Sequence, residues 1–400
     1  MSTITRQELF DKIRSTREQH KTPDLSRVNL ENMDLRQQDL LGVNFQNADL
    51  QSCNLEGVDL RNANLQGAKL GGVNLRQADL TGASLENANL ERADLQGAKL
   101  AGCNLQKANL HNVNLQDTDL TKTNLQKANL QGINVQGANL TEANLEEQEL
   151  HLLDLTTTKL QGANLNSANL AGADLANLDL RNISLQGANL EGANLQNSNL
   201  QGANLNKMSG FFSKKITKLS GTDLSGANLA GIQLHEADLR ATKLTGVMFT
   251  QADLEGANLR GVNLEGVDLR EAKLPRVNLD EANLQGANLQ QANLQESSLE
   301  GINLQGVNLK RVNLQGGNLK HGNLQGTNLA GVDLQNAQLP NANLTDAQLH
   351  GADLSGANLR GANLSGSNLL ATCLKGAIYD AQTQWPDTLD VTLVSGLRSA

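Results

Sequence analysis

A leucine stands at every fifth position from Leu25 to Leu205 and again, one residue out of step, from Leu219 to Leu374. The first run holds 37 such centres and the second 32, and only Phe45, Val135 and Phe249 replace the leucine. A five-residue step rotates a helical position by about 140°, so the leucines would wind around a helix and form no stripe. An odd spacing also places successive leucines on opposite faces of a plain strand. Neither regular element explains the period.

Alternation does work within one five-residue unit. In Ala63-Asn64-Leu65-Gln66-Gly67, the alanine and leucine point inward, the asparagine points outward, and the last two residues turn a corner. Glycine is frequent at the second corner position, where a type II turn needs a positive φ. Pro275 and Pro340 occupy the first corner position, where a φ fixed at about −65° suits the turn. The sequence predicts three-residue sides joined by two-residue corners.

One such unit cannot bury its leucine alone, but coiled and stacked units build a continuous core. Each buried leucine contributes about 1.5–3 kcal/mol before chain entropy is subtracted. The repeat needs no aromatic core, and the aromatic content is only 2%. The A-(N/D)-L-x-x units resemble the pentapeptide-repeat family over most of the 400 residues. That resemblance implies an all-β solenoid, a right-handed quadrilateral β-helix with four pentads per coil. At about 4.8 Å per coil, about 17 coils would extend over roughly 80 Å.

The expected organisation has five parts. We expect an N-terminal cap helix at 1–22, a first repeat run at 23–205, an irregular insert at 206–218, a second run at 219–376, and a C-terminal cap or tail at 377–400. The tail holds the chain's only tyrosine and only tryptophan, and it resembles the tails of cyanobacterial pentapeptide-repeat proteins. Both ends are interpreted as lids over edges that would otherwise pair with other chains.

The cap helix has a clear start. Thr5 and Glu8 have the spacing of a capping box. The helix is expected to run to about His20, with Leu9, Phe10 and Ile13 on one face. Covering the first coil is the simplest role for that face, and docking of a partner is the alternative.

The insert is the one place where the leucine period breaks. It holds four lysines and no acid, whereas the whole chain has a formal charge of −9. Such local departures from a pattern mark function or strain. Phe211, Phe212 and Ile216 would refill the core if the insert is a structural joint. A protruding recognition loop and a flexible hinge are the alternatives, and the candidate protein-binding residues are Phe211, Phe212, Lys214 and Lys215.

A second, milder irregularity spans residues 146–158. Gln148 and Leu153 there replace the small inward residue, so we expect a local change in coil shape.

No catalytic, cofactor-binding or metal-binding pattern is found. His111 and His151 would share a face two coils apart, about 10 Å, which is too far for one metal ion. Zinc-binding, phosphate-loop and nucleophile-elbow motifs are missing. Cys53 and Cys103 occupy small inward positions on different sides, and Cys373 has no evident partner, so no disulfide is expected. We therefore expect a protein that is not an enzyme and needs no cofactor.

Charge and composition bear on the partner. A negative chain with few aromatic residues is a poor nucleic-acid binder. The family resemblance also offers DNA mimicry that protects a type II topoisomerase, but an 80 Å duplex carries roughly 45–50 charges. Lysines interrupt the best acidic column, which is expected to run through Asp39, Asp59, Asp79, Lys99, Asp119, Asn139, Lys159 and Asp179.

The favoured function is a rigid scaffold or protein–protein interaction module, with topoisomerase protection as the alternative. The partner is expected to be a protein of unknown identity, with no nucleic acid, membrane or small-molecule substrate. The start of the chain resembles no signal peptide, and no apolar run approaches 18 residues, so a cytoplasmic location is expected.

Overall fold

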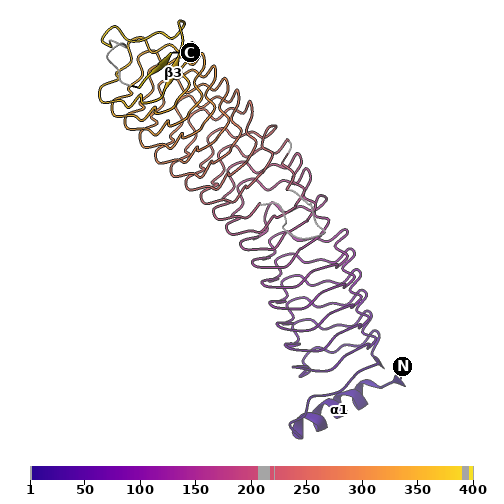
Figure 1. Ribbon diagram of the computed structural model, residues 1–400. Helices are drawn as coiled ribbons and strands as arrows, with labels where there is room; N and C mark the ends of the chain where they lie inside the picture. The colour runs from indigo at the N-terminus through magenta and orange to yellow at the C-terminus, as the bar shows by residue number, and fades with distance from the viewer. Residues whose placement is uncertain (1, 206–216, 220, 390–395, 400) are drawn as a thin grey trace. The chain divides into compact units, whose positions relative to one another are not determined.

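A computed structural model describes residues 2–205, 217–219, 221–389 and 396–399. The chain forms two compact units, residues 1–189 and 190–400. Named secondary structure is sparse: one helix, α1 (Arg6–Glu18), and four two-residue strands, β1 (Ser2–Thr3), β2 (Val28–Asn29), β3 (Ile378–Tyr379) and β4 (Arg398–Ser399). The rest of each unit is built from short sides and turns that wind into stacked coils (Figure 1).

Parallel bridges join residues 20 apart in the chain, as in Asn44 with Asn64 and Asn64 with Ser84. Four pentads span that distance, so four sides make one coil, as predicted. At most corners the small inward residue donates its N–H to the preceding leucine carbonyl, as Ala68 does to Leu65 at 3.0 Å. The residue between them, Gly67, has a φ of 65°, which is the left-handed conformation that the second corner position of a type II turn requires.

The outward asparagine fixes both the corner and the stack. The Oδ1 atom of Asn64 accepts the N–H of Gln66 at 3.2 Å, which closes an Asx turn. Its Nδ2 atom donates to the Oδ1 of Asn44 in the preceding coil at 3.1 Å. Where lysine takes this position one coil after an aspartate, it reaches back to that acid; Lys69 Nζ lies 3.0 Å from Asp49 Oδ2. The preference for Asn or Asp before each leucine thus follows from hydrogen bonding along the coil and between coils.

The core contains the central leucines and the small inward residues, as expected. Some small polar residues at the inward position donate to a carbonyl 23 residues earlier: Thr118 Oγ1 to Leu95 at 3.1 Å, and Cys53 Sγ to Leu30 at 2.9 Å. Burial raises the pKa of the Cys53 thiol to about 11 and that of Cys103 to about 12. Both cysteines are buried and free, as their inward positions predict.

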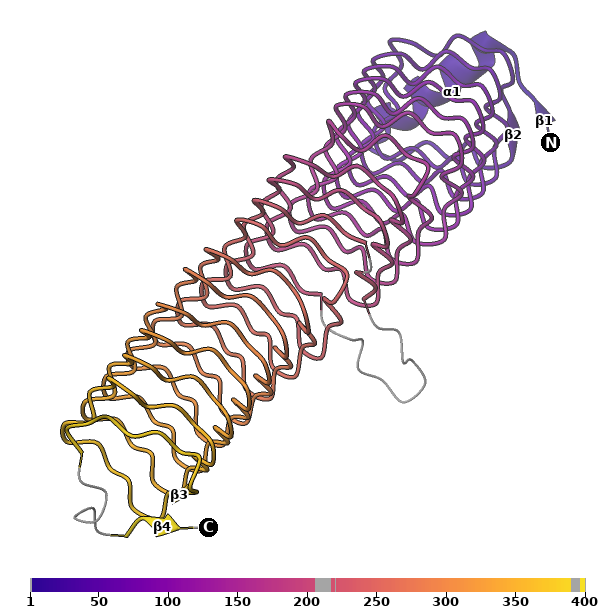
Figure 2. The ribbon, with the colours of Figure 1, turned by 90° about the horizontal axis from the view of Figure 1, so that it is seen from above.

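The N-terminal end of the first unit is covered by α1, which lies beyond the first coil (Figure 1); Figure 2 shows the same end from above. Thr5 accepts the N–H of Glu8 at 3.3 Å, and the Glu8 carboxylate accepts the Thr5 N–H at 2.8 Å, which confirms the capping box. The helix ends at Glu18, slightly before the predicted end at His20. Before the helix, β1 pairs in parallel with β2, which adds a rung to the first coil.

The inward face of α1 is narrower than the sequence predicts. Leu9 and Ile13 are buried, whereas Phe10 is only half-buried. The Arg6 guanidinium lies 5.0 Å from the centre of the Phe10 ring and covers it in a cation–π contact. Phe10 therefore packs against Arg6 of its own helix, at the edge of the surface that α1 buries.

At the C-terminal end of the second unit, β3 pairs in parallel with β4. The rings of Tyr379 and Trp385 meet edge to face, with centroids 5.7 Å apart and planes inclined by 76°. These aromatic residues pack against one another over the last coils, in keeping with a closing role for the tail. In the described part of the chain, no helix is long and apolar enough to cross a membrane.

Candidate functional site

The ladder of bridges is interrupted beside the irregular stretch of the first unit. Asn124 bridges to Asn144, and Asn139 bridges to Lys159. Between them, among the described residues, no bridge joins Asn129 to Glu149 or Asn134 to Asp154. The interruption coincides with the irregular stretch at 146–158, so the expectation of an altered coil shape there is confirmed. Two neighbouring coils have separated along part of their length.

Side chains replace some of the lost backbone hydrogen bonds. Gln148 is buried, and its Nε2 donates to the Leu125 carbonyl at 2.9 Å, the role that Thr and Cys play elsewhere. The Thr157 hydroxyl accepts the N–H of Gly137 at 2.9 Å. Side-chain hydrogen bonds, first from Thr156 and then from Gln136, hold the pKa of Asp154 below its usual range. The separated coils are therefore held in place by specific polar contacts.

Core packing changes at the same place. Val135 replaces a central leucine, and the larger Ile133 and Leu153 occupy inward positions that elsewhere hold small residues. They border a small apolar cavity of about 10 Å³, which other central leucines complete. The volume lost at Val135 is thus largely returned by its two enlarged neighbours.

A cleft of about 410 Å³ opens on the outside of the separated coils. One wall is formed by residues 127–132 and the other by residues 147–149 and 151–153. Leu152 borders it with 82% of its surface exposed, in a chain whose central leucines are buried. Glu149 and His151 border the cleft beside it, with Oε2 and Nδ1 3.3 Å apart. An accessible aliphatic side chain thus lies next to carboxylates in a hollow; we call this the Leu152 cleft.

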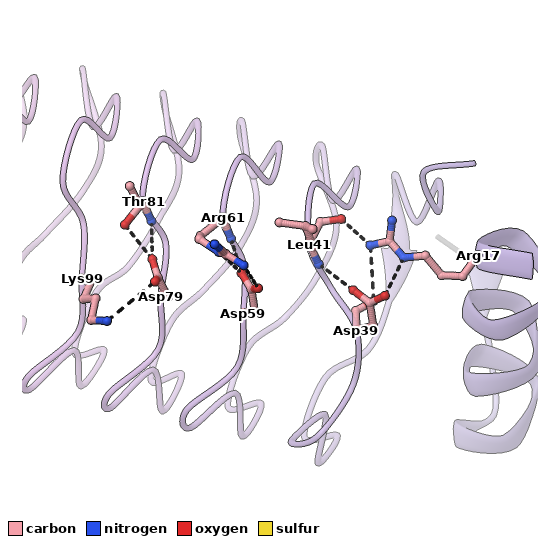
Figure 3. A network of polar contacts seen from close by, with 8 residues as sticks. All are labelled: Arg17, Asp39, Leu41, Asp59, Arg61, Asp79, Thr81 and Lys99. Carbon is pink, nitrogen blue, oxygen red and sulfur yellow. Dashed lines mark hydrogen bonds and ion pairs between the residues drawn. The ribbon is translucent and has the colours of Figure 1, made fainter. Parts of the chain in front are cut away.

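The predicted acidic column forms from Asp59 to Lys159, and the carboxylates at its start are paired with cations. Bridges join Asp59 to Asp79, Asp79 to Lys99, and Lys99 onward to Asp119, Asn139 and Lys159. The carboxylates at its start lie beside cations: Asp39 beside Arg17 at 3.1 Å, Asp59 beside Arg61 at 2.6 Å, and Asp79 beside Lys99 at 3.9 Å (Figure 3). Arg17 reaches the column from α1. A column whose first three carboxylates are neutralised is a poor imitation of a phosphate backbone.

Pairing of this kind recurs as an Asp-Leu-Arg triplet. The arginine is two residues after the aspartate and folds back onto it; Arg181 and Asp179 lie 2.6 Å apart. Hydrogen bonds from the Arg181 guanidinium hold the pKa of Asp179 down to about 2. The Arg36 guanidinium lowers the pKa of Asp34 to about 2 in the same way. The triplets therefore add ionised groups to the surface without adding net charge.

Comparison with known families decides the assignment. The family model described as pentapeptide repeats matches 24–62, 59–97, 88–126, 121–147, 128–166, 149–187, 173–207, 217–256, 308–346 and 342–378. A second model, pentapeptide repeat region, matches 242–324. The chain belongs to the pentapeptide-repeat family. No curated protein matches it.

Solved structures of other pentapeptide-repeat proteins resemble the chain. HetL, involved in heterocyst differentiation regulation in the cyanobacterium Nostoc sp. strain PCC 7120, is 27% identical over 77% of this chain and 90% of its own, with a TM-score of 0.22. Rfr23 from the cyanobacterium Cyanothece 51142 is 36% identical over 32% of this chain and 90% of its own, with a TM-score of 0.17. Full-length QnrB1, a plasmid-mediated fluoroquinolone resistance protein, is 19% identical over 50% of this chain and 92% of its own, with a TM-score of 0.18.

In this pentapeptide-repeat protein, the coil that contains the insert has four complete sides without it. Asn194 bridges to Asp223, 29 residues on, whereas the regular spacing is 20. Leu205 and Leu219 are successive core positions, and Thr217 fills the small inward position between them. The link at this corner is nine residues longer than a regular one. The candidate residues Phe211, Phe212, Lys214 and Lys215 lie outside the described residues, as does Ile216, and their role stays a prediction.

Sequence reasoning singled out the insert and missed the Leu152 cleft. Leu152 occupies the second corner position, where glycine and asparagine are frequent. A large apolar residue there, followed by Leu153 at a small inward position, was the available signal. His111 and His151 each lie near a glutamate of their own, Glu91 and Glu149 respectively, and do not share a site.

Proposed function

We propose that this chain is a right-handed quadrilateral β-helix that acts in the cytoplasm as a non-enzymatic protein-interaction module. The observation that carries the proposal is Leu152, which is 82% exposed beside a cleft between two separated coils. Burying an aliphatic side chain of this size on binding is favourable by about 1.5–3 kcal/mol. A rigid surface also loses little conformational entropy when a partner docks.

The partner's chemistry follows from the cleft. Glu147 and Glu149 border it together with Lys127 and His151. An apolar anchor beside acidic groups suits a protein segment that presents an aliphatic or aromatic side chain next to an arginine or lysine. We expect one such segment to bind across the separated coils.

The alternative function, DNA mimicry toward a type II topoisomerase, has less support. The mimicry needs a continuous run of unpaired negative charge. In the described part of the predicted column, Asp39, Asp59 and Asp79 each lie beside a cation. The neutralised aspartates favour the interaction module.

The test is affinity capture from an extract of the source organism. The baits are the intact chain, Leu152→Asp, and Leu370→Asp as a matched control. Leu370 is another corner leucine, 75% exposed, in the second unit. A fourth bait lacks 207–215, which restores the five-residue spacing between Leu205 and Leu219. Circular dichroism confirms that each bait is folded.

We expect Leu152→Asp to lose a captured protein that the intact chain, the Leu370→Asp variant and the deletion variant retain. If only the deletion variant loses the captured protein, the insert rather than the Leu152 cleft is the recognition site. Equal capture by all four baits would refute recognition at the Leu152 cleft. Capture of a type II topoisomerase that duplex DNA displaces would favour the mimicry function.

A further inference from the structure

The second unit brings together three side chains that can ligate a metal. His235, Asp253 and Glu255 each offer one nitrogen or oxygen atom, and these atoms all lie within 4.8 Å of one another. One pair among them, His235 Nε2 and Asp253 Oδ1, is 2.8 Å apart. Zinc binds imidazole nitrogen and carboxylate oxygen at about 2.0–2.2 Å, so its ligand atoms lie about 3–4 Å from one another. Shifts of about 1 Å would complete the geometry.

The backbone holds the three residues in this relation. His235 belongs to one coil, and Asp253 and Glu255 belong to the next. Flanking residues pair the two coils: the Leu234 N–H donates to the Asp253 carbonyl at 2.8 Å, and the Glu236 N–H donates to the Glu255 carbonyl at 2.9 Å. Only side-chain rotation is needed to converge on an ion. Such preorganisation lowers the cost of binding.

We propose that His235, Asp253 and Glu255 form a binding site for a divalent transition metal, with Zn²⁺ the best match. One imidazole and two carboxylates form a mixed nitrogen and oxygen set that suits Zn²⁺ better than Mg²⁺, which prefers oxygen ligands. Three protein ligands leave a fourth position to water or to a group from a partner. The ion would link two neighbouring coils.

Two cations lie close to the same carboxylates. Lys273 Nζ is 3.8 Å from Asp253 Oδ2, and Arg276 contacts the Glu255 carboxylate. Both cationic side chains are well exposed, at 69% and 59%. Exposed ion pairs of this kind contribute little to stability, so a divalent ion can displace them into solvent. Lys273 and Arg276 therefore weaken metal binding without preventing it.

His111 is the matched control because, among the residues that the structure describes, it is ion-paired with one carboxylate, that of Glu91. Its Nδ1 atom lies 3.8 Å from Glu91 Oε1, and the metal-ligand cluster does not include it. Its side chain is as accessible as that of His235, 32% against 40%. Substituting His111 tests for nonspecific binding of zinc to surface histidines.

The experiment is a calorimetric titration of the full, tag-free chain with Zn²⁺, and with Mg²⁺ in parallel. We expect one Zn²⁺ per chain, lost or weakened at least about tenfold by His235→Ala and by Glu255→Gln, and unchanged by His111→Ala. Lys273→Gln should tighten binding severalfold because it removes a competing cation. That gain cannot come from a folding defect.

Zinc should also raise the Tm of the intact chain and leave that of His235→Ala unchanged, since the ion joins two coils. Failure to bind Zn²⁺, or equal binding by the intact chain and His235→Ala, would overturn the proposal. Weaker binding in Lys273→Gln would also contradict it. This metal site does not depend on the Leu152 cleft, so either proposal can fail alone.

Discussion

At the residue scale, the pentapeptide is specified by the asparagine or aspartate before each leucine as much as by the leucine. The Asn64 amide accepts a corner N–H and donates to the coil before it. Leucine at the centre is 0% exposed at Leu65 and throughout most of the array. The leucine makes the core favourable, and the amide sets how the chain turns and stacks.

Burial makes two of the three cysteine thiols less reactive than the third. A thiol reacts as its thiolate, and burial raises the pKa of the Cys53 and Cys103 thiols to about 11 and 12. Cys373 is exposed. We expect a thiol reagent at pH 8 to label one cysteine per native chain and three in denaturant. Mass spectrometry after labelling checks this, and rapid labelling of Cys53 in the native chain would contradict the described core.

The Asp-Leu-Arg triplets predict a loss of stability in acid. Asp179 has a folded-state pKa of about 2, below the ordinary 3.8, chiefly because Arg181 hydrogen-bonds to it. Its contribution is complete above pH ~4 and disappears as the pH falls toward 2. Because the pair is exposed, the effect is about 0.2–1 kcal/mol.

We therefore expect Asp179→Asn to be slightly less stable than the intact chain at pH 7 and to lose less stability between pH 4 and pH 2.5. Urea unfolding at each pH measures the difference. Identical pH profiles for the two proteins would show that the Arg181 contact adds nothing to stability.

At the element scale, the irregular coil is the feature that the repeat does not explain. Gln148 and Leu153 occupy inward positions that hold small residues elsewhere in the array, and bridges between neighbouring coils are missing beside them. Side-chain hydrogen bonds replace some of the missing backbone hydrogen bonds between the two coils. One of them is the 2.9 Å bond from Gln148 to the Leu125 carbonyl. The Leu152 cleft is therefore maintained by particular side chains of the irregular coil.

Substitution of Gln148 tests that view. Gln148→Leu should destabilise the first unit by about 0.5–1.5 kcal/mol because it removes one buried hydrogen bond. Gln148→Glu should cost more, since it places a carboxylate against a carbonyl in the core. Urea unfolding measures both, with Glu149→Gln at a 71% exposed side chain as a neutral control. Equal stability of Gln148→Glu and the intact chain would show that Gln148 is not buried as described.

At the scale of the whole molecule, the sequence predicts the architecture well because one short period repeats through most of the chain. The inward and outward positions and the helix cap follow from leucine spacing, turn chemistry and the Thr5–Glu8 pair, whereas the 20-residue register was implied by the family resemblance. The site is harder to predict because it depends on a departure from the period. Whether Leu152 is exposed depends on how two coils separate, and spacing alone does not determine that.

The metal-ligand cluster was predictable in principle. His235 and Glu255 are 20 residues apart, the same distance as any bridged pair, so they occupy one column. A search for histidines in one column with acids in the next coil would have found them. Comparing histidines only with one another, as with His111 and His151, misses this pair.

The most direct test of the interaction account is site-specific photo-cross-linking in source-organism extract. A benzophenone amino acid is placed at position 152, at position 370 as an exposed-leucine control, or at position 212 in the insert. We predict a discrete protein adduct from position 152 that is absent from position 370. An adduct from position 212 with none from 152, or no adduct from any position, would contradict the claim that the Leu152 cleft binds the partner.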